Sequence, residues 1–143
     1  MKRTAAVLFA LSLAVAAPVA ARAADISDSD RAAIQSVIND QIHAFQRDDG
    51  ATAYADASPT IQSIFTTPDA FMAMVKNGYQ PVYRPQSLTF GDIVDSEAGP
   101  LQKVFVTGPD GQSYLAVYTL QRQPDGSWKI NGCSLVDNDS PSI

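Results

Sequence analysis

The chain has one histidine and one cysteine, so the side chains most used in nucleophilic catalysis and metal binding are scarce. A catalytic triad needs a histidine beside its nucleophile, and zinc sites need several histidine or cysteine ligands. On a helical wheel His43 lies opposite the apolar positions of its segment, which is typical of a solvated residue. Cys133 has no partner for an internal disulfide and is typical of a small buried residue. We therefore expect no histidine-based centre, no metal and no other cofactor.

Seven of the fifteen acidic residues fall at predicted helix ends or turns, where carboxylates cap backbone N–H groups. These residues are Asp28, Asp30, Asp48, Asp49, Asp69, Asp110 and Asp125. Asp56 and Asp92 have no such role, and either could face the mouth of a pocket. One hypothesis is therefore a small isomerase, cyclase or hydrolase in which Asp56, Asp92 or a tyrosine carries a proton.

A second group of residues is suited to lining a ligand pocket. Gln41 falls inside the apolar stripe of its predicted helix, so its amide needs a partner. That partner is either a neighbouring strand, Tyr83 or Tyr118, or a bound ligand. Tyrosines offer apolar walls with polar tips, and Arg84 is either a contact for a carboxylate-bearing ligand or a solvated charge. The predicted pocket residues are Gln41, Tyr54, Tyr79, Tyr83, Arg84 and Tyr118.

The N-terminal residues have the order of a secretory signal peptide. Lys2 and Arg3 precede an apolar run over 5–17, and the small-residue motif Ala21-Arg22-Ala23 follows. The run is shorter than the roughly 20 residues that a membrane-spanning helix needs. We predict that residues 1–23 are a signal peptide cleaved after Ala23, and that residues 24–143 form one periplasmic or secreted domain.

The charge balance disfavours partners that carry phosphates. The chain has ten basic and fifteen acidic residues, and cleavage would remove Lys2, Arg3 and Arg22, leaving seven basic residues and a net charge of −8. Such a chain repels nucleic acids and anionic membranes. The expected partners are therefore a small apolar ligand or a protein, including a second copy of the chain, with no nucleic acid and no membrane after cleavage.

The first half of this domain predicts helices. Ser27 can cap a helix whose apolar residues recur through Phe45, with Gly50 in the left-handed position after its end. Ser58-Pro59 and Thr67-Pro68 each place a capping hydroxyl before a proline at the first helical position.

Two connections follow from the same residues. Residues 51–57, between the first helix and these two, predict a brief helical turn. Pro81 and Pro85 restrict the residues before them, so residues 79–85 predict an extended connection into the sheet.

The second half predicts four strands, over 87–95, 101–107, 113–122 and 127–136. Short turns such as Gly108-Pro109-Asp110-Gly111 join them, so the strands form an antiparallel meander. Gly132 predicts a bulge that changes the inward face within the last strand. The inward residues are then Trp128, Ile130, Cys133 and Leu135, and the aromatic core is expected to contain Phe71, Phe90, Phe105 and Trp128.

Helices followed by a meander predict an α+β domain, with N-terminal helices packed on one face of a curved four-stranded antiparallel sheet. The segments Tyr79–Pro85 and Trp128–Cys133 resemble a family of short exported bacterial proteins known as domain of unknown function 4864. The order of elements is similar to the nuclear-transport-factor-2-like, or SnoaL-like, superfamily of cystatin-like cone folds. That superfamily includes polyketide cyclases and ketosteroid isomerase, but no set of residues here matches their motifs position by position. The resemblance therefore implies a cone with a cavity over the whole domain and implies no activity.

Three hypotheses about function follow. The residues favour a non-catalytic binding module that holds a small apolar ligand or a protein in an apolar cone. The alternatives are the small enzyme described above and a dimeric interaction protein that uses the outer sheet face. In the last case Leu115 and Val117 would point outward as an apolar patch.

Overall fold

The computed structural model describes residues 26–137, so the predicted signal peptide, residues 1–23, and its cleavage site lie outside the described residues. Helices precede strands, as predicted. The helices are α1 (Asp28–Gln46), α2 (Gly50–Ala55), α3 (Pro59–Ile64), α4 (Pro68–Gly78) and α5 (Gln80–Tyr83). The strands are β1 (Ser87–Ser96), β2 (Gly99–Thr107), β3 (Ser113–Arg122) and β4 (Trp128–Asp137). None of the described helices is long and apolar enough to cross a membrane.

Hydroxyl caps begin three of the helices, as the sequence predicts. The Ser27 hydroxyl accepts a hydrogen bond from the third backbone N–H of α1, at 3.1 Å. Ser58 and Thr67 cap α3 and α4 in the same way, each followed by a proline in the first turn. These contacts satisfy backbone donors that have no partner inside the helix.

The predicted end of α1 is wrong in one detail. Asp48, not Gly50, takes the left-handed conformation, with φ at 54°. Aspartate tolerates this region better than most residues because its short side chain can hydrogen-bond locally. Gly50 instead begins α2, which Asp49 caps through the backbone N–H and the hydroxyl of Thr52.

The prediction of an extended segment over 79–85 is also wrong in part, because Gln80–Tyr83 forms the short helix α5. Pro81 lies in its first turn, where a missing N–H breaks no intrahelical bond. Arg84, which precedes Pro85, does leave the helical region, with φ −138° and ψ 60°.

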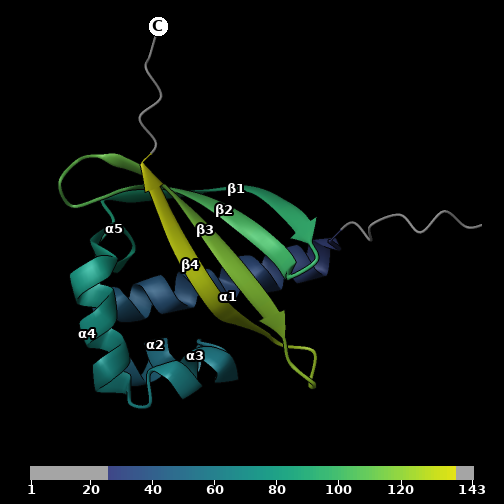
Figure 1. The fold of residues 1–143 in the computed structure, drawn as a ribbon. Coiled ribbons are helices and arrows are strands. Elements are labelled where there is room, and N and C mark those ends of the chain that lie inside the picture. Colours follow the sequence, from purple (N-terminus) through teal and green to yellow (C-terminus); the bar gives the residue numbers. More distant parts are fainter. Residues whose placement is uncertain (1–25, 138–143) are drawn as a thin grey trace, which may run out of the picture.

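The four strands pair in the order β1-β2-β3-β4, and every pairing is antiparallel. Figure 1 shows them as one curved sheet with α1 running across it. The predicted bulge in β4 is confirmed: Thr119 pairs with Gly132 and Leu120 with Ile130, so Asn131 has no opposite residue. The bulge keeps Trp128 and Ile130 in the core and also turns later β4 residues inward.

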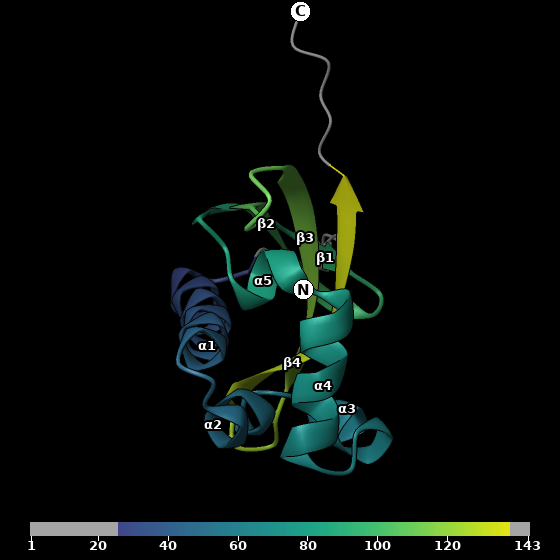
Figure 2. The ribbon, with the colours of Figure 1, turned by 90° about the vertical axis from the view of Figure 1, so that its left-hand side faces the viewer.

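Two hydrophobic clusters hold the domain together. The first, here called the aliphatic core, lies between α1 and the inner face of the sheet and includes Ile34, Ile38, Ile42, Val104 and Leu120. The second, here called the aromatic cluster, joins α1, α2, α4 and α5. Figure 2 shows α1 nearly end-on and α4 standing vertically beside it, with α2 and α3 near the lower end of α4.

One predicted core residue lies on the other face of the sheet. Phe105 is 42% exposed, whereas Phe71 and Trp128 are buried and Phe90 is partly buried, so the core prediction is wrong for Phe105. The neighbours of Phe105 on either side in β2 point inward. Because successive residues of a strand point to opposite faces of the sheet, Phe105 points outward. The Phe105 ring packs against Gly91 of β1, where an added Cβ would lie 2.7 Å from it.

Candidate ligand cavity

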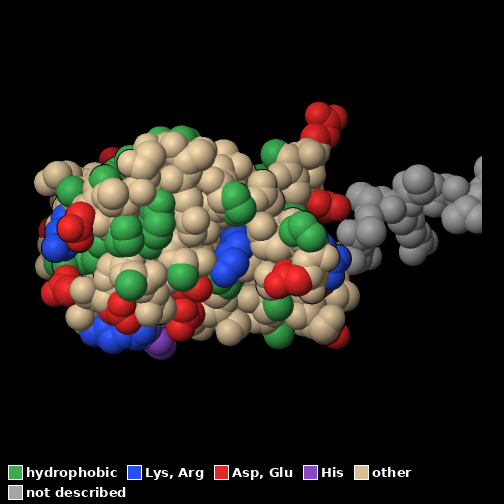
Figure 3. Space-filling model, turned by 90° about the horizontal axis from the view of Figure 1, so that it is seen from below, with side chains coloured by type: hydrophobic (Ala, Val, Ile, Leu, Met, Phe, Trp, Pro, Cys, Tyr) green, Lys and Arg blue, Asp and Glu red, His purple; other side chains and the backbone are tan. Residues whose placement is uncertain are grey.

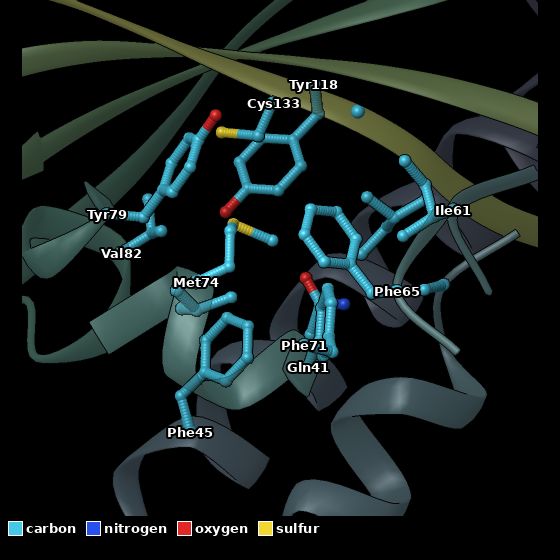
Figure 4. A pocket seen from close by; sticks show the side chains of 14 residues that line it. Gln41, Phe45, Ile61, Phe65, Phe71, Met74, Tyr79, Val82, Tyr118 and Cys133 are labelled. Carbon is cyan, nitrogen blue, oxygen red and sulfur yellow. The ribbon is translucent and has the colours of Figure 1, made fainter. Parts of the chain in front are cut away.

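A partly open cavity of about 250 Å³ lies between the helices and the inner face of the sheet. Its walls come from α1, α3, α4, α5 and the strands β3 and β4 (Figure 4). The lining residues are Gln41, Phe45, Ala57, Ile61, Phe65, Phe71, Met74, Val75, Tyr79, Val82, Tyr118, Ile130, Gly132 and Cys133. Most of them are hydrocarbon, aromatic or sulfur-containing, as is typical of ligand pockets.

The predicted pocket residues divide into two groups in the structure. Gln41, Tyr79 and Tyr118 line the cavity, whereas Tyr54, Tyr83 and Arg84 do not belong to its lining. All three residues of the second group have polar partners in the protein, whereas the Tyr118 hydroxyl has none among the described residues.

Tyr118 is the most buried polar side chain of the cavity. The residue is 1% exposed, and its hydroxyl meets no hydrogen-bond partner among the described residues. Figure 4 shows this hydroxyl pointing from β3 into the hollow. Burial, with a smaller effect of the nearby Cys133, raises the pKa of Tyr118 well above its usual value, so the hydroxyl keeps its proton.

Cys133 lies directly opposite Tyr118 on the neighbouring strand. Burial of its thiol raises the pKa to about 12, and the nearby Tyr118 hydroxyl lowers it slightly. Because the thiolate is the nucleophilic form, this thiol is poorly reactive at neutral pH. Cys133 therefore contributes a soft apolar wall.

Gln41 connects α1 to the cavity and to α2. The residue is 4% exposed, and its Nε2 donates a hydrogen bond of 3.0 Å to the Ala53 carbonyl. The sequence analysis considered a strand or a tyrosine as its protein partner, and the structure supplies a helix backbone instead. The side-chain oxygen accepts no hydrogen bond within the described part of the chain, and Figure 4 shows it pointing into the cavity.

Tyr54 connects two short helices. Its hydroxyl lies 2.7 Å from the Phe65 carbonyl and 3.1 Å from the Gln62 carbonyl. The Gln62 amide returns a hydrogen bond of 2.9 Å to the Tyr54 carbonyl. Its ring packs against Phe71 at 5.8 Å between centroids, so Tyr54 supports the cavity wall from behind.

Tyr83, Arg84 and Asp48 form a cluster that joins α5 to the end of α1, here called the α1–α5 junction. The Tyr83 hydroxyl donates to the Asp48 carboxylate, and Arg84 pairs with the same carboxylate at 3.0 Å. The Arg84 guanidinium lies 4.1 Å from the centre of the Tyr83 ring and also donates to the Phe45 carbonyl. The hydrogen bond from Tyr83, with a further effect of the Arg84 charge, lowers the pKa of Asp48. The same hydrogen bond raises the pKa of Tyr83, and the Arg84 charge opposes that shift.

The candidate proton carriers lie outside the cavity lining. Asp92 is exposed on β1. Asp56 ends α2 and is half-buried; this burial, together with the neighbouring Asp40 carboxyl, raises its pKa to about 7. Lys129 and Arg47 oppose that shift from nearby. His43 is exposed, as predicted, and Figure 3 shows the histidine side chain at the surface beside basic and acidic side chains.

Within residues 26–137, no group of three or more histidine, cysteine, aspartate or glutamate side chains could hold a metal ion. A model of the family described as "Domain of unknown function (DUF4864)" matches residues 27–143. The chain belongs to this family. No curated protein and no solved structure matched it.

Sequence reasoning missed part of the lining of this DUF4864 member. The sequence places Ile61, Phe65 and Met74 on the two helices that begin at Pro59 and Pro68, but no spacing marks them as facing a hollow. It also missed Gln102, a fully buried amide that donates to the carbonyls of Gly91 and Lys103. Residues of β2 alternate between the inner and the outer face of the sheet, and this alternation could have identified Gln102 as a buried polar residue.

Proposed function

We propose that this member of the DUF4864 family is a binding module that holds a small, largely apolar molecule in its cavity. The observation that carries the proposal is the Tyr118 hydroxyl, which is buried, aimed into the hollow and unpartnered among the described residues. A buried polar group without a hydrogen bond costs about 1–3 kcal/mol. A ligand that accepts this hydrogen bond would remove that cost.

The polar groups of the cavity support binding more than proton transfer. Among the described lining residues there is no carboxylate and no imidazole. Tyr118 and Cys133 both have raised pKa values, so neither exchanges a proton readily near neutral pH. The enzyme hypothesis would instead need Asp56, whose neighbour is Asp40 and which does not line the cavity.

Propylbenzene, an uncharged probe, tests the proposal on the full chain. We expect calorimetry to show binding by the wild-type protein. Met74→Trp fills the hollow from α4 and should abolish binding. Ile64→Trp is the matched control, because Ile64 is 63% exposed on α3 and outside the lining. Absence of binding by the wild type, or equal binding by the two tryptophan variants, would overturn the proposal.

Export forms part of the proposed function. It is supported by the basic, apolar and small-residue order of residues 1–23. The expected result in a Gram-negative host is a periplasmic protein whose N-terminus is Ala24. Recovery of the uncleaved chain in the cytoplasm would contradict this part of the proposal.

Self-association through the outer sheet face is a second candidate function. Phe105 and Val136 are 42% and 51% exposed, and Leu115 lies between them in one cross-strand row. This row of exposed side chains extends to the edge strand β4. A two-fold dimer needs only one self-complementary patch on each copy, and the row could supply that patch. Sedimentation of the wild type and Phe105→Ser tests this candidate. A wild-type monomer would exclude it.

A further inference from the structure

We infer that the cavity selects an uncharged molecule that has a compact hydrocarbon body, accepts a hydrogen bond from Tyr118 and donates one to Gln41. This inference rests on the proposed function and specifies its ligand class. Three features of the described residues carry it: the size of the hollow, the direction of its two polar groups and the absence of charge from its lining.

The size of the hollow limits the ligand. A dry apolar cavity of about 150 Å³ holds one benzene molecule, which has six non-hydrogen atoms. The cavity here has a volume of about 250 Å³. By proportion it accommodates about ten non-hydrogen atoms. A monocyclic or short branched skeleton fits this space, whereas a long acyl chain or a steroid would extend outside it.

The Tyr118 hydroxyl requires an acceptor. The residue is 1% exposed, and its hydroxyl meets no hydrogen-bond geometry within the described part of the chain. Its polar neighbour is the Cys133 thiol, a weak acceptor, so a stronger acceptor would have to come from a molecule inside the cavity. Because burial raises its pKa, the hydroxyl remains protonated and acts as a donor over the physiological pH range. A ketone, ester, ether or alcohol oxygen would satisfy it.

Gln41 offers an acceptor to the cavity. The Ala53 carbonyl can only accept, so the hydrogen bond between them fixes Nε2 on that side of the amide. The amide oxygen is thereby turned toward the hollow (Figure 4). A ligand hydroxyl or N–H would satisfy this oxygen from the helix side of the cavity.

The lining disfavours a charged ligand. None of the described lining residues is an arginine, lysine, aspartate or glutamate. Arg84, which the sequence offered as an anion contact, is held in the α1–α5 junction by Asp48 and the Tyr83 ring. A carboxylate in the hollow would lose its hydration without gaining a counter-ion, which is strongly unfavourable.

Three probes with nearly the same skeleton test the inference. Propylbenzene has no polar group, propiophenone adds an acceptor, and 1-phenylpropan-1-ol adds both an acceptor and a donor. Their affinities are measured by calorimetry for the wild type and for Tyr118→Phe. For each probe, the ratio of its affinity for the wild type to its affinity for Tyr118→Phe is compared. The free energy of removing the probe from water is the same in both measurements, so it cancels from this ratio.

We expect Tyr118→Phe to weaken propiophenone about tenfold and to leave propylbenzene unchanged, since one net hydrogen bond is lost. The alcohol should weaken by a similar factor, because its hydrogen bond to Gln41 is present in both proteins and cancels from this ratio. Gln41→Met should instead weaken the alcohol more than the ketone, which has no donor for the Gln41 oxygen. The infrared stretching frequency of the propiophenone carbonyl should fall when the ketone binds to the wild type. This shift reports the hydrogen bond directly, without the use of a variant.

Each contrary result identifies its cause. If propylbenzene does not bind the wild type, the proposed function itself fails. If propylbenzene binds but the ketone shows neither a Tyr118→Phe effect nor a shifted carbonyl stretch, the assigned role of Tyr118 fails. If Gln41→Met does not weaken the alcohol more than the ketone, Gln41 is not an acceptor. If 3-phenylpropanoate binds as well as the alcohol at neutral pH, the assigned neutrality is wrong.

Discussion

The α1–α5 junction and the cavity lie on either side of Phe45 and use similar side chains in opposite ways. At the junction, the Tyr83 hydroxyl donates to Asp48, and Arg84 occupies the ring face and the nearby carbonyl. In the cavity, the Tyr118 hydroxyl is more deeply buried and has no partner among the described residues. Both tyrosines looked alike in the sequence as candidate pocket residues.

The difference shows how a structural polar group is distinguished from one available to a ligand. A tyrosine whose hydroxyl is bonded within the protein stabilises the fold and has no further need of a partner. A tyrosine whose hydroxyl is buried and unbonded lowers the stability of the empty protein. Substitutions in the two regions should therefore affect stability and binding in different proportions.

Gln41→Met should give the largest loss of stability, because Gln41 is a structural donor as well as part of the cavity. The Ala53 carbonyl would lose its side-chain partner, and we expect the free energy of unfolding to fall by about 1–3 kcal/mol. Gln46→Met, on the exposed end of the same helix, should change it by less than about 0.5 kcal/mol. Urea unfolding measures both variants, and equal stabilities would show that Gln41 has no structural role.

Arg84→Met tests the junction and should have the next largest effect. The substitution removes a cation–π contact and a partly exposed ion pair, which together contribute about 1–2 kcal/mol. Arg31→Met is the control, since no side-chain hydrogen bond or ion pair of Arg31 is found in residues 26–137. Propylbenzene affinity should not change in Arg84→Met. A large change in affinity would mean that the two regions are not separate.

Asp56 provides a pH-dependent effect. Its pKa of about 7 in the folded protein exceeds the usual value of 3.8, so the folded state binds the proton more tightly than the unfolded state. Its contribution should make stability fall as pH rises from about 4 to about 7 and level off above that range. Asp56→Asn should flatten this slope in urea unfolding at a series of pH values. An unchanged slope would show that Asp56 is not the titrating group.

Tyr118→Phe should have the smallest effect on the empty protein. Removing an unpartnered hydroxyl should leave the free energy of unfolding within about 0.5 kcal/mol of the wild type, or raise it. Tyr83→Phe is the matched substitution at the junction and should lower stability, because Asp48 loses its donor. If the two variants lose the same stability, the contrast between the regions is wrong.

Local signals in the sequence were sufficient to predict much of this fold. The caps at Ser27, Ser58 and Thr67 depend on contacts within three residues, so they could be identified without tertiary structure. The bulge beside Gly132 and the burial of Gln41 followed from strand and helix periodicity. The helix at Gln80–Tyr83 was missed because the first-turn role of Pro81 was not considered there.

The candidate site could be predicted only as a set of residue types. Whether a tyrosine is satisfied depends on partners distant in the sequence: Asp48 for Tyr83 and the carbonyl of Phe65 for Tyr54. The pairing of Tyr118 with Cys133 is likewise set by strand register across a turn. No local pattern encodes these distances, so the four candidate tyrosines look equivalent in the sequence, and the structure separates them.

The most direct test of the account is a crystal structure of the full chain bound to propiophenone. The account predicts the ring of the ligand among the aromatic and sulfur-containing residues of the cavity, with its carbonyl oxygen about 2.7–2.8 Å from the Tyr118 hydroxyl. A ligand bound elsewhere, or a carbonyl turned away from Tyr118, would contradict it.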